Sequence, residues 1–144
     1  MKHSLIVLTL SAALAACTSS APIRWAPPTD FDLAVADNPA QRRFDLTLTS
    51  KAADPLCLSR EAWPAEGAVP AGFDGATLTT SSGKRELLPT GSAYCPGGCG
   101  EVRVEPGQTV RGTLPYSAFG DATAIAEDTV RSLAFEVHPF VCSQ

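Results

Sequence analysis

The chain has 144 residues and a formal net charge of −4, with 11 basic residues against 15 acidic ones. This length suits one domain and is long enough to bury a modest core. An acidic chain is a poor match for nucleic acid or for anionic lipid headgroups, so we expect no nucleic-acid partner. Eleven glycines and twelve prolines, without helix-length apolar periodicity, argue against a helical bundle.

The first residues have the organisation of an export signal. Lys2 and His3 precede an apolar run over residues 5–14, which is too short to cross ~30 Å of hydrocarbon. The run closes in Leu14-Ala15-Ala16-Cys17, and small residues directly before a cysteine resemble the lipobox of bacterial lipoproteins. We therefore interpret residues 1–16 as a lipoprotein signal peptide.

The lipobox resemblance implies a lipid anchor on Cys17, and hence the membrane as a partner. In such proteins the cysteine receives a diacylglyceryl thioether, the peptide is cut before it, and the new amino terminus is acylated. Several chains give stable anchoring, because each buried CH₂ contributes only ~0.8 kcal/mol. In many Gram-negative lipoproteins, Asp after the cysteine retains the protein in the inner membrane. Thr18 follows the cysteine here, so the resemblance implies the outer membrane, with the domain facing the periplasm. The alternative is ordinary secretion with cleavage near Ala16.

Residues 17–30 are interpreted as a tether, because small, polar and proline-rich residues cannot build a core. Residues 31–144 form the expected domain. Trp25 is an unusual aromatic residue for a tether. It either docks on the domain as a first partial strand or rests at the membrane interface.

Short strands are expected through much of residues 31–144. Apolar and polar residues alternate from Phe44 to Thr49, which places Phe44, Leu46 and Leu48 on an inner face. Residues 76–80 and 85–88 are expected to form a hairpin. Other extended segments are expected at residues 56–58, 101–105, 110–114, 133–137 and 140–142.

The fold class expected from this pattern is all-β, an antiparallel immunoglobulin-like β-sandwich stapled by disulfides. Residues 104–116, with Pro106-Gly107 before an alternating segment, are similar to the proline-glycine turn and strand of many bacterial immunoglobulin-like domains. Residues 59–63 are expected to form one helical turn, with Ser59 as the N-cap and Pro64 ending it. Residues 122–130 are expected to form a short turn or loop.

Four cysteines remain besides Cys17, an even number that indicates two disulfides in an oxidising compartment. Cys95 and Cys99 bracket Pro96-Gly97-Gly98, a segment able to fold back tightly, so we favour Cys95–Cys99 and Cys57–Cys142. Four cysteines allow three pairings, and the two crossed pairings stay open at this point.

The segment from Tyr94 to Cys99 also resembles the copper motif of Sco-type copper chaperones. The resemblance implies a copper-binding metallochaperone in which Cys95, Cys99 and His138 hold the ion. Two thiolates and an imidazole suit Cu(I) and overlap with the ligand sets of Zn²⁺. Glu101 to Val104 alternate as a strand, whereas the Sco-type motif is followed by a helix.

The sequence contains few residues or motifs that are typical of an enzyme active site. His138 is the single histidine after residue 16, so it would have to serve any histidine-dependent chemistry. The chain has no Gly-x-Ser-x-Gly motif, and its glycine cluster near residue 98 precedes a strand instead of a phosphate-binding helix. Asp and Glu residues occur throughout the chain, so a glycosidase that uses two carboxylates stays open as an alternative. We expect no enzyme and no cofactor.

These observations predict a lipid-anchored binding or scaffolding protein of the cell envelope. Its partner is expected to be an unidentified envelope protein, contacted through the loops around Cys95–Cys99 and residues 119–121. A hydrolase inhibitor is a variant within this class, because a rigid disulfide loop lowers the entropic cost of binding. The copper-binding protein with Cys95, Cys99 and His138 is the alternative.

Overall fold

The computed structural model describes residues 22–65, 69–91, 95–96 and 98–143. The predicted signal peptide and Cys17 lie outside the described residues. Within them the chain is mostly β, with three antiparallel three-stranded sheets and only short helices. The all-β, disulfide-linked character expected from the sequence is therefore confirmed.

The first sheet has the order β1-β2-β7, with β1 (Phe31–Asn38), β2 (Arg43–Ser50) and β7 (Thr109–Pro115). Every second residue of β2 is buried, and Phe44, Leu46 and Leu48 are each at most 1% exposed. This is the inner face that the period-two alternation predicts.

The second sheet has the order β5-β4-β8, with β4 (Ala76–Thr80), β5 (Gly83–Glu86) and β8 (Ser132–Phe135). Strands β4 and β5 form the predicted hairpin, but β5 begins and ends two residues earlier than the expected 85–88, because Thr80 already pairs with Gly83 across a tighter turn. The Thr80 hydroxyl donates to the Gly83 carbonyl over 3.0 Å and so closes the turn.

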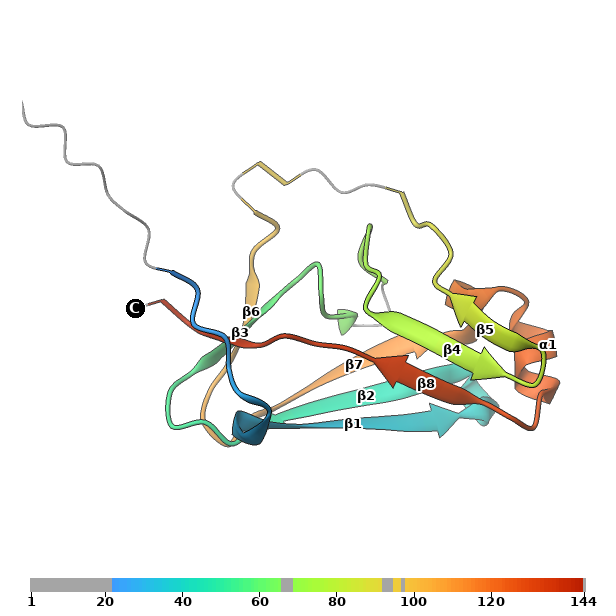
Figure 1. Ribbon diagram of the computed structural model, residues 1–144, viewed down its shortest axis with the longest axis horizontal. Helices are drawn as coiled ribbons and strands as arrows, with labels where there is room; N and C mark the ends of the chain where they lie inside the picture. Colours follow the sequence, from blue (N-terminus) through green and yellow to red (C-terminus); the bar gives the residue numbers. More distant parts are fainter. Residues whose placement is uncertain (1–21, 66–68, 92–94, 97, 144) are drawn as a thin grey trace, which may run out of the picture.

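The third sheet has the order β6-β3-β9, with β3 (Leu56–Ser59) between β6 (Glu101–Val104) and β9 (Phe140–Val141). It lies at the end of the molecule where the C-terminus and the first described residues meet (Figure 1). Trp25 adds an isolated antiparallel bridge to Phe140, so the chain begins to pair with the fold six residues before the expected boundary at residue 31.

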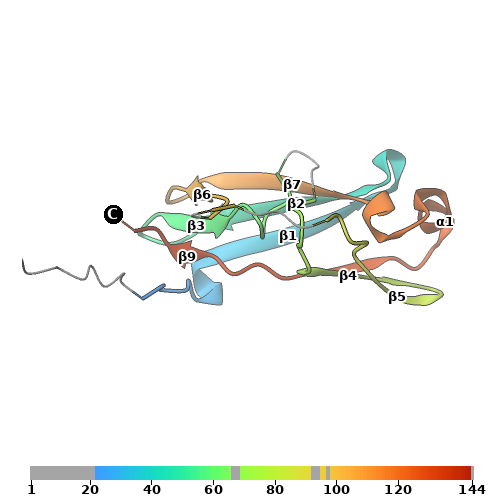
Figure 2. The same cartoon turned by 90° about the horizontal axis from the view of Figure 1, so that it is seen from above.

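The sheets lie against one another around one core. Seen from above, β1, β2 and β7 form one side, with β4, β5 and β8 on the other (Figure 2). The core between them is built from apolar side chains of all three sheets and of the segments joining them. The largest side chains with almost no exposure are Trp63, Tyr116, Phe44, Leu46, Leu48, Leu56, Leu58, Leu78, Leu114 and Ile125.

The helical turn expected at residues 59–63 is only partly right, because Ser59 Oγ accepts from the Glu61 N–H over 3.2 Å as an N-cap would, but no helix forms there. Ser59 is the last residue of β3 and pairs with Glu101 of β6. The chain then reverses in a turn that the Ala62 N–H to Ser59 carbonyl bond closes at 3.0 Å. Trp63 lies in the core, where its indole N–H donates to the Arg111 carbonyl. The backbone conformation that buries this side chain is not helical.

The short turn or loop expected at residues 122–130 is only partly right. Its first part forms the α-helix α1 (Ala122–Glu127), with Asp121 as N-cap. The three-residue 3-10 turns η1 (Pro28–Asp30) and η2 (Pro39–Gln41) flank β1, and η4 (Tyr116–Phe119) leads from β7 toward α1. Ile125 is 1% exposed and packs the helix onto the core.

Candidate functional site

The structure joins Cys95 to Cys99 and Cys57 to Cys142, the two pairs favoured from the sequence. The Cα atoms of Cys95 and Cys99 are 5.0 Å apart. Between them, the Gly98 N–H donates to the Cys95 carbonyl over 2.8 Å, and Gly98 adopts a φ of 94°. This backbone conformation favours glycine, which explains why a tight bend is possible here.

The Cys95–Cys99 loop is held beside the end of β3. The Arg60 N–H donates to the Gly100 carbonyl over 3.1 Å and so extends the pairing of β3 with β6. Next in the chain, the Glu61 carboxylate lies 3.0 Å from Cys99 Sγ. Among the described residues, Glu61, Cys95 and Cys99 form a group whose possible ligand atoms all lie within 4.8 Å of one another.

His138 is not part of that group. Its exposed ring packs edge-on against Trp25, with 6.3 Å between ring centroids. The structure thus brings Glu61 to the two sulfur atoms, whereas the sequence offered His138 as the third ligand.

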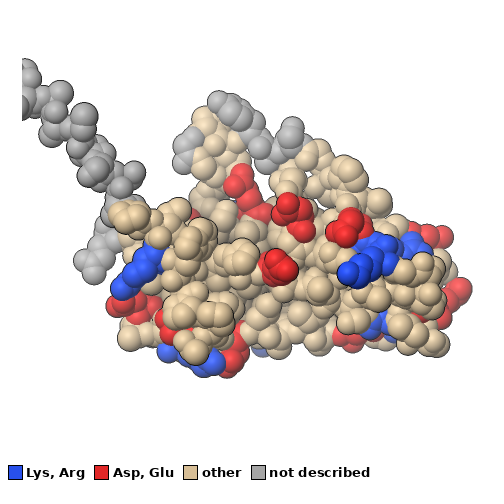
Figure 3. Space-filling view, in the orientation of Figure 1, with Lys and Arg blue, Asp and Glu red and all other residues tan. Residues whose placement is uncertain are grey.

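A groove of about 490 Å³ runs from Glu61 to His138. Its lining combines three acidic side chains, Glu61, Asp74 and Glu136, with aromatic rings, and none of the described residues that line it is lysine or arginine. Figure 3 shows acidic side chains across the middle of this face, with basic side chains toward its two ends. The groove is therefore electronegative and favours cationic groups. Its aromatic members are Trp25, Phe73, His138 and Phe140.

Sequence reasoning missed this acidic set. Glu61 follows β3, Asp74 precedes β4 and Glu136 follows β8. Residues so far apart in the chain carry no local signal of their meeting. They are brought together because the ends of three strands from two sheets converge there.

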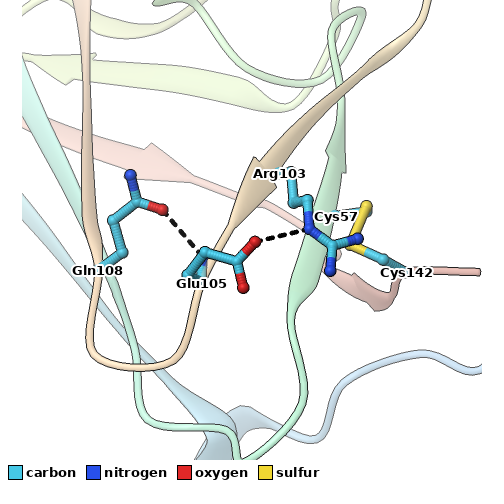
Figure 4. Close-up of a disulfide and its surroundings, with 5 residues drawn as sticks. All are labelled: Cys57, Arg103, Glu105, Gln108 and Cys142. Carbon is cyan, nitrogen blue, oxygen red and sulfur yellow. Dashed lines mark hydrogen bonds and ion pairs between the residues drawn. A yellow bond between two sulfur atoms is a disulfide. The ribbon is translucent and has the colours of Figure 1, made fainter. Parts of the chain in front are cut away.

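The Cys57–Cys142 disulfide joins the middle strand of the third sheet to the C-terminal segment. The Cα atoms are 5.1 Å apart and the sequence separation is 85 residues. Figure 4 shows Arg103 beside this disulfide, paired with Glu105 at 2.7 Å, while the Glu105 N–H donates to Gln108 Oε1 at 2.9 Å. These polar contacts stabilise the β6–β7 turn, and the disulfide holds the C-terminal segment to β3, so we assign this region a structural role.

A second polar cluster lies at the opposite end of the fold. The buried Tyr116 hydroxyl donates to the Asp37 carboxylate, which also accepts from Arg131 Nε at 2.9 Å. Burial, and then the hydrogen bond to Asp37, raise the pKa of Tyr116 to about 12. Arg131 also donates to the carbonyls of Ile125 and Ala126 at the C-terminus of α1, so the cluster ties the helix to β1.

The segment at residues 119–121, expected to contact a partner, is used by the fold itself. Phe119 is 3% exposed. Asp121 accepts from the N–H groups of Thr123 and Ala124 at the start of α1. Phe119 is therefore not available as a contact residue, whereas Asp121 is exposed. We take the Cys95–Cys99 loop and the adjoining groove, where acidic and aromatic side chains meet, as the candidate site.

Comparison with models of known protein families, with curated proteins and with solved structures finds no match for this chain. Among the described residues, no helix combines the length and the apolar composition needed to cross a membrane.

Proposed function

We propose that this protein is a lipid-anchored binding or scaffolding component of the cell envelope, without catalytic activity of its own. The Leu14 to Cys17 motif supports the anchor, and Thr18 supports an outer-membrane location facing the periplasm. The observation that carries the binding role is the acidic and aromatic groove beside the disulfide loop.

The chemistry of the groove indicates the kind of partner. Three carboxylates without a lining lysine or arginine attract a basic segment, and the Phe73 and Phe140 rings offer apolar surface and cation–π contacts. The adjoining Cys95–Cys99 loop is already constrained, so little conformational entropy is lost when a partner packs on it. A basic segment of an envelope protein is the partner we propose, and a hydrolase inhibited by the loop is a variant of it.

We further propose that the three sheets form an immunoglobulin-like sandwich. The arrangement of β1-β2-β7 on one side and β5-β4-β8 on the other supports it (Figure 2). All strand pairs are antiparallel, as in sandwiches of that class.

Site-specific photo-crosslinking in living cells tests the binding role. A photoreactive residue at Ala62, which lines the groove, should give one major covalent product with an envelope protein. The same residue at Lys84, near the β4–β5 turn, serves as the control and should give none. Equal products at the two positions, or none at Ala62, would contradict the assignment.

Charge variants sharpen this test. Glu136→Gln removes one groove carboxylate and should lower the crosslinking yield at Ala62, and added salt should lower it further. Glu127→Gln removes a carboxylate that is also exposed, at the end of α1, and should leave the yield unchanged. If both variants behave alike, the groove does not recognise the partner by charge.

The metal-binding alternative is favoured by one observation, the position of Glu61 beside Cys95 and Cys99. In the reduced protein, two thiolates and a carboxylate would offer a ligand set better suited to Zn²⁺ than to Cu(I), because oxygen is the harder donor. We propose this as a second candidate function, with Glu61 in the place that the sequence assigned to His138.

Titration of the reduced protein with Zn²⁺ and with Cu(I) tests this alternative. Binding should require reduction, weaken in Glu61→Gln and persist in His138→Ala. Absence of binding after reduction would remove the metal function, and loss of binding in His138→Ala would restore the Sco-like ligand set.

A further inference from the structure

We propose that the end of the domain bearing Ile23 and Trp25 lies on the bilayer surface, with the Trp25 indole among the lipid headgroups. This inference rests on the lipid anchor proposed above and adds an orientation to it. The occupant of this apolar surface is thus the membrane itself.

The first described residues are fixed to the fold. The Val141 N–H donates to the Arg24 carbonyl over 2.9 Å, and the Ala26 N–H donates to the Pro139 carbonyl over 2.8 Å. Trp25 lies between these two bonds and forms the bridge to Phe140. The position of its side chain is therefore set by the domain, so any surface that Trp25 touches orients the whole domain.

Ile23 and Trp25 are unusually exposed for their type. Ile23 is 61% exposed and Trp25 is 59% exposed. The Trp25 ring is supported edge-on by Phe140, with 5.9 Å between centroids, and by His138. Tryptophan combines an apolar body with an N–H donor, which makes it a preferred residue at membrane interfaces.

The anchor confines this end of the domain to the bilayer. Cys17 precedes Ile23 by six residues, and six residues span at most roughly 20 Å when fully extended. With the lipid of Cys17 in the bilayer, Ile23 and Trp25 are the large exposed apolar residues with the shortest path along the chain to the membrane.

Charge does not draw this end toward anionic lipid. Arg24 pairs with Asp54 at 2.9 Å, and Arg103 pairs with Glu105 at 2.7 Å. These basic groups are matched by acids, so contact with the bilayer depends on apolar area instead of on anionic lipid. Because Trp25 also lines the acidic groove, we expect this orientation on zwitterionic vesicles and expect anionic lipid to add nothing to it.

The two tryptophans make the orientation measurable. Trp63 is 2% exposed in the core, whereas Trp25 is exposed. The acylated protein is purified from the envelope and reconstituted in phosphatidylcholine vesicles, with or without brominated acyl chains. The difference between the wild-type emission and that of Trp25→Phe, which keeps Trp63, isolates Trp25. We expect the Trp25 emission to be blue-shifted and strongly quenched by the brominated lipid, with Trp63 unaffected.

Matched serine variants complete the test. Ile23→Ser should reduce the quenching of Trp25, while Leu88→Ser, at a residue 50% exposed outside this end, should leave it unchanged. Acylated Cys17 with an unquenched Trp25 would overturn the orientation and leave the anchor standing. Mass spectrometry that shows no acyl chain on Cys17 would overturn the anchor and the orientation together.

Discussion

At the scale of single residues, Tyr116 is the side chain whose environment is most unusual. It is buried, its hydroxyl donates to Asp37, and the Arg131 guanidinium lies 5.7 Å from the ring centroid. Burial followed by the Asp37 interaction raises its pKa from 10.0 to about 12. The cluster stabilises the fold only while the hydroxyl keeps its proton.

The raised pKa of Tyr116 makes stability depend on alkaline pH. A raised folded-state pKa means that the contribution is complete below pH 10 and is lost as pH rises toward 12. Urea unfolding of the wild type should therefore show a fall in stability between these values. Tyr116→Phe should be less stable at neutral pH by about 1–3 kcal/mol, because Asp37 loses a partner, and should lack most of this alkaline fall. An equal fall in the variant would contradict the assignment.

Gly112 of β7 lies so close to Pro64 and Trp63 that there is no room for a larger side chain. A Cβ atom at this position would lie 2.8 Å from the Pro64 carbonyl oxygen and 3.2 Å from the Trp63 ring. Gly112→Ala should therefore destabilise the protein by about 1–3 kcal/mol in denaturant unfolding, because the buried indole would have to shift. Arg111→Ala, at the exposed neighbouring position, is the control and should change stability little.

At the scale of elements, α1 depends on its caps because six residues do not form a stable helix alone. Hydrogen bonds from the N–H groups of Ala124 and Thr123 hold the pKa of Asp121 below its usual 3.8. At the other end, Arg131 binds the last carbonyls. The helix therefore forms only where both ends are capped by side chains of the folded domain.

Removing the N-cap should lower the melting temperature in a pH-dependent way. Asp121→Ala should unfold at lower temperature than wild type near neutral pH. Because the folded-state pKa is lowered, the carboxylate stabilises the fold above about pH 3.8 and loses that effect as pH falls further. Asp121→Asn retains a capping side chain and should be affected less. A wild-type advantage that persists in strong acid would contradict this explanation.

At the scale of the whole molecule, the two disulfides differ in what they constrain. Cys57–Cys142 closes a separation of 85 residues, whereas Cys95–Cys99 closes four. The first ties β3 to the C-terminal segment, and the second shapes one loop. The entropy of the unfolded chain therefore falls much more when Cys57–Cys142 forms.

Replacing each disulfide by two serines should show that one disulfide mainly stabilises the fold and that the other mainly supports binding. Replacement of Cys57 and Cys142 by serine should cost about 3–5 kcal/mol, and replacement of Cys95 and Cys99 about 2 kcal/mol, in the chain-entropy model. Denaturant unfolding measures the first effect. Crosslinking at Ala62 should be impaired by loss of Cys95–Cys99 even where the domain stays folded, and equal stability losses would contradict the entropic account.

Local patterns in the sequence predicted much of the fold. The alternation over β2 placed Phe44, Leu46 and Leu48 on the buried face, and the β4–β5 hairpin followed from two extended segments around a turn. Strand β1 is absent from the expected strands, because as an edge strand it has several exposed residues and lacks a clear buried face. No helix forms at residues 59–63, where Ser59 pairs in β3 and Trp63 is buried in the core, because these long-range contacts leave no local signal in the sequence.

The sequence by itself determined the β-rich class and favoured the Cys95–Cys99 pair, because alternation and a short bend depend on residues close together in the chain, whereas the pairing of Cys57 with Cys142 joins residues 85 apart. The tertiary structure alone decided that Glu61, Asp74 and Glu136 share a groove, that Glu61 and not His138 approaches the sulfur atoms, and that Trp25 is pinned to Phe140. The physical reason is that strand order sets which distant segments meet, and short-range alternation specifies a strand's buried face without specifying its neighbours.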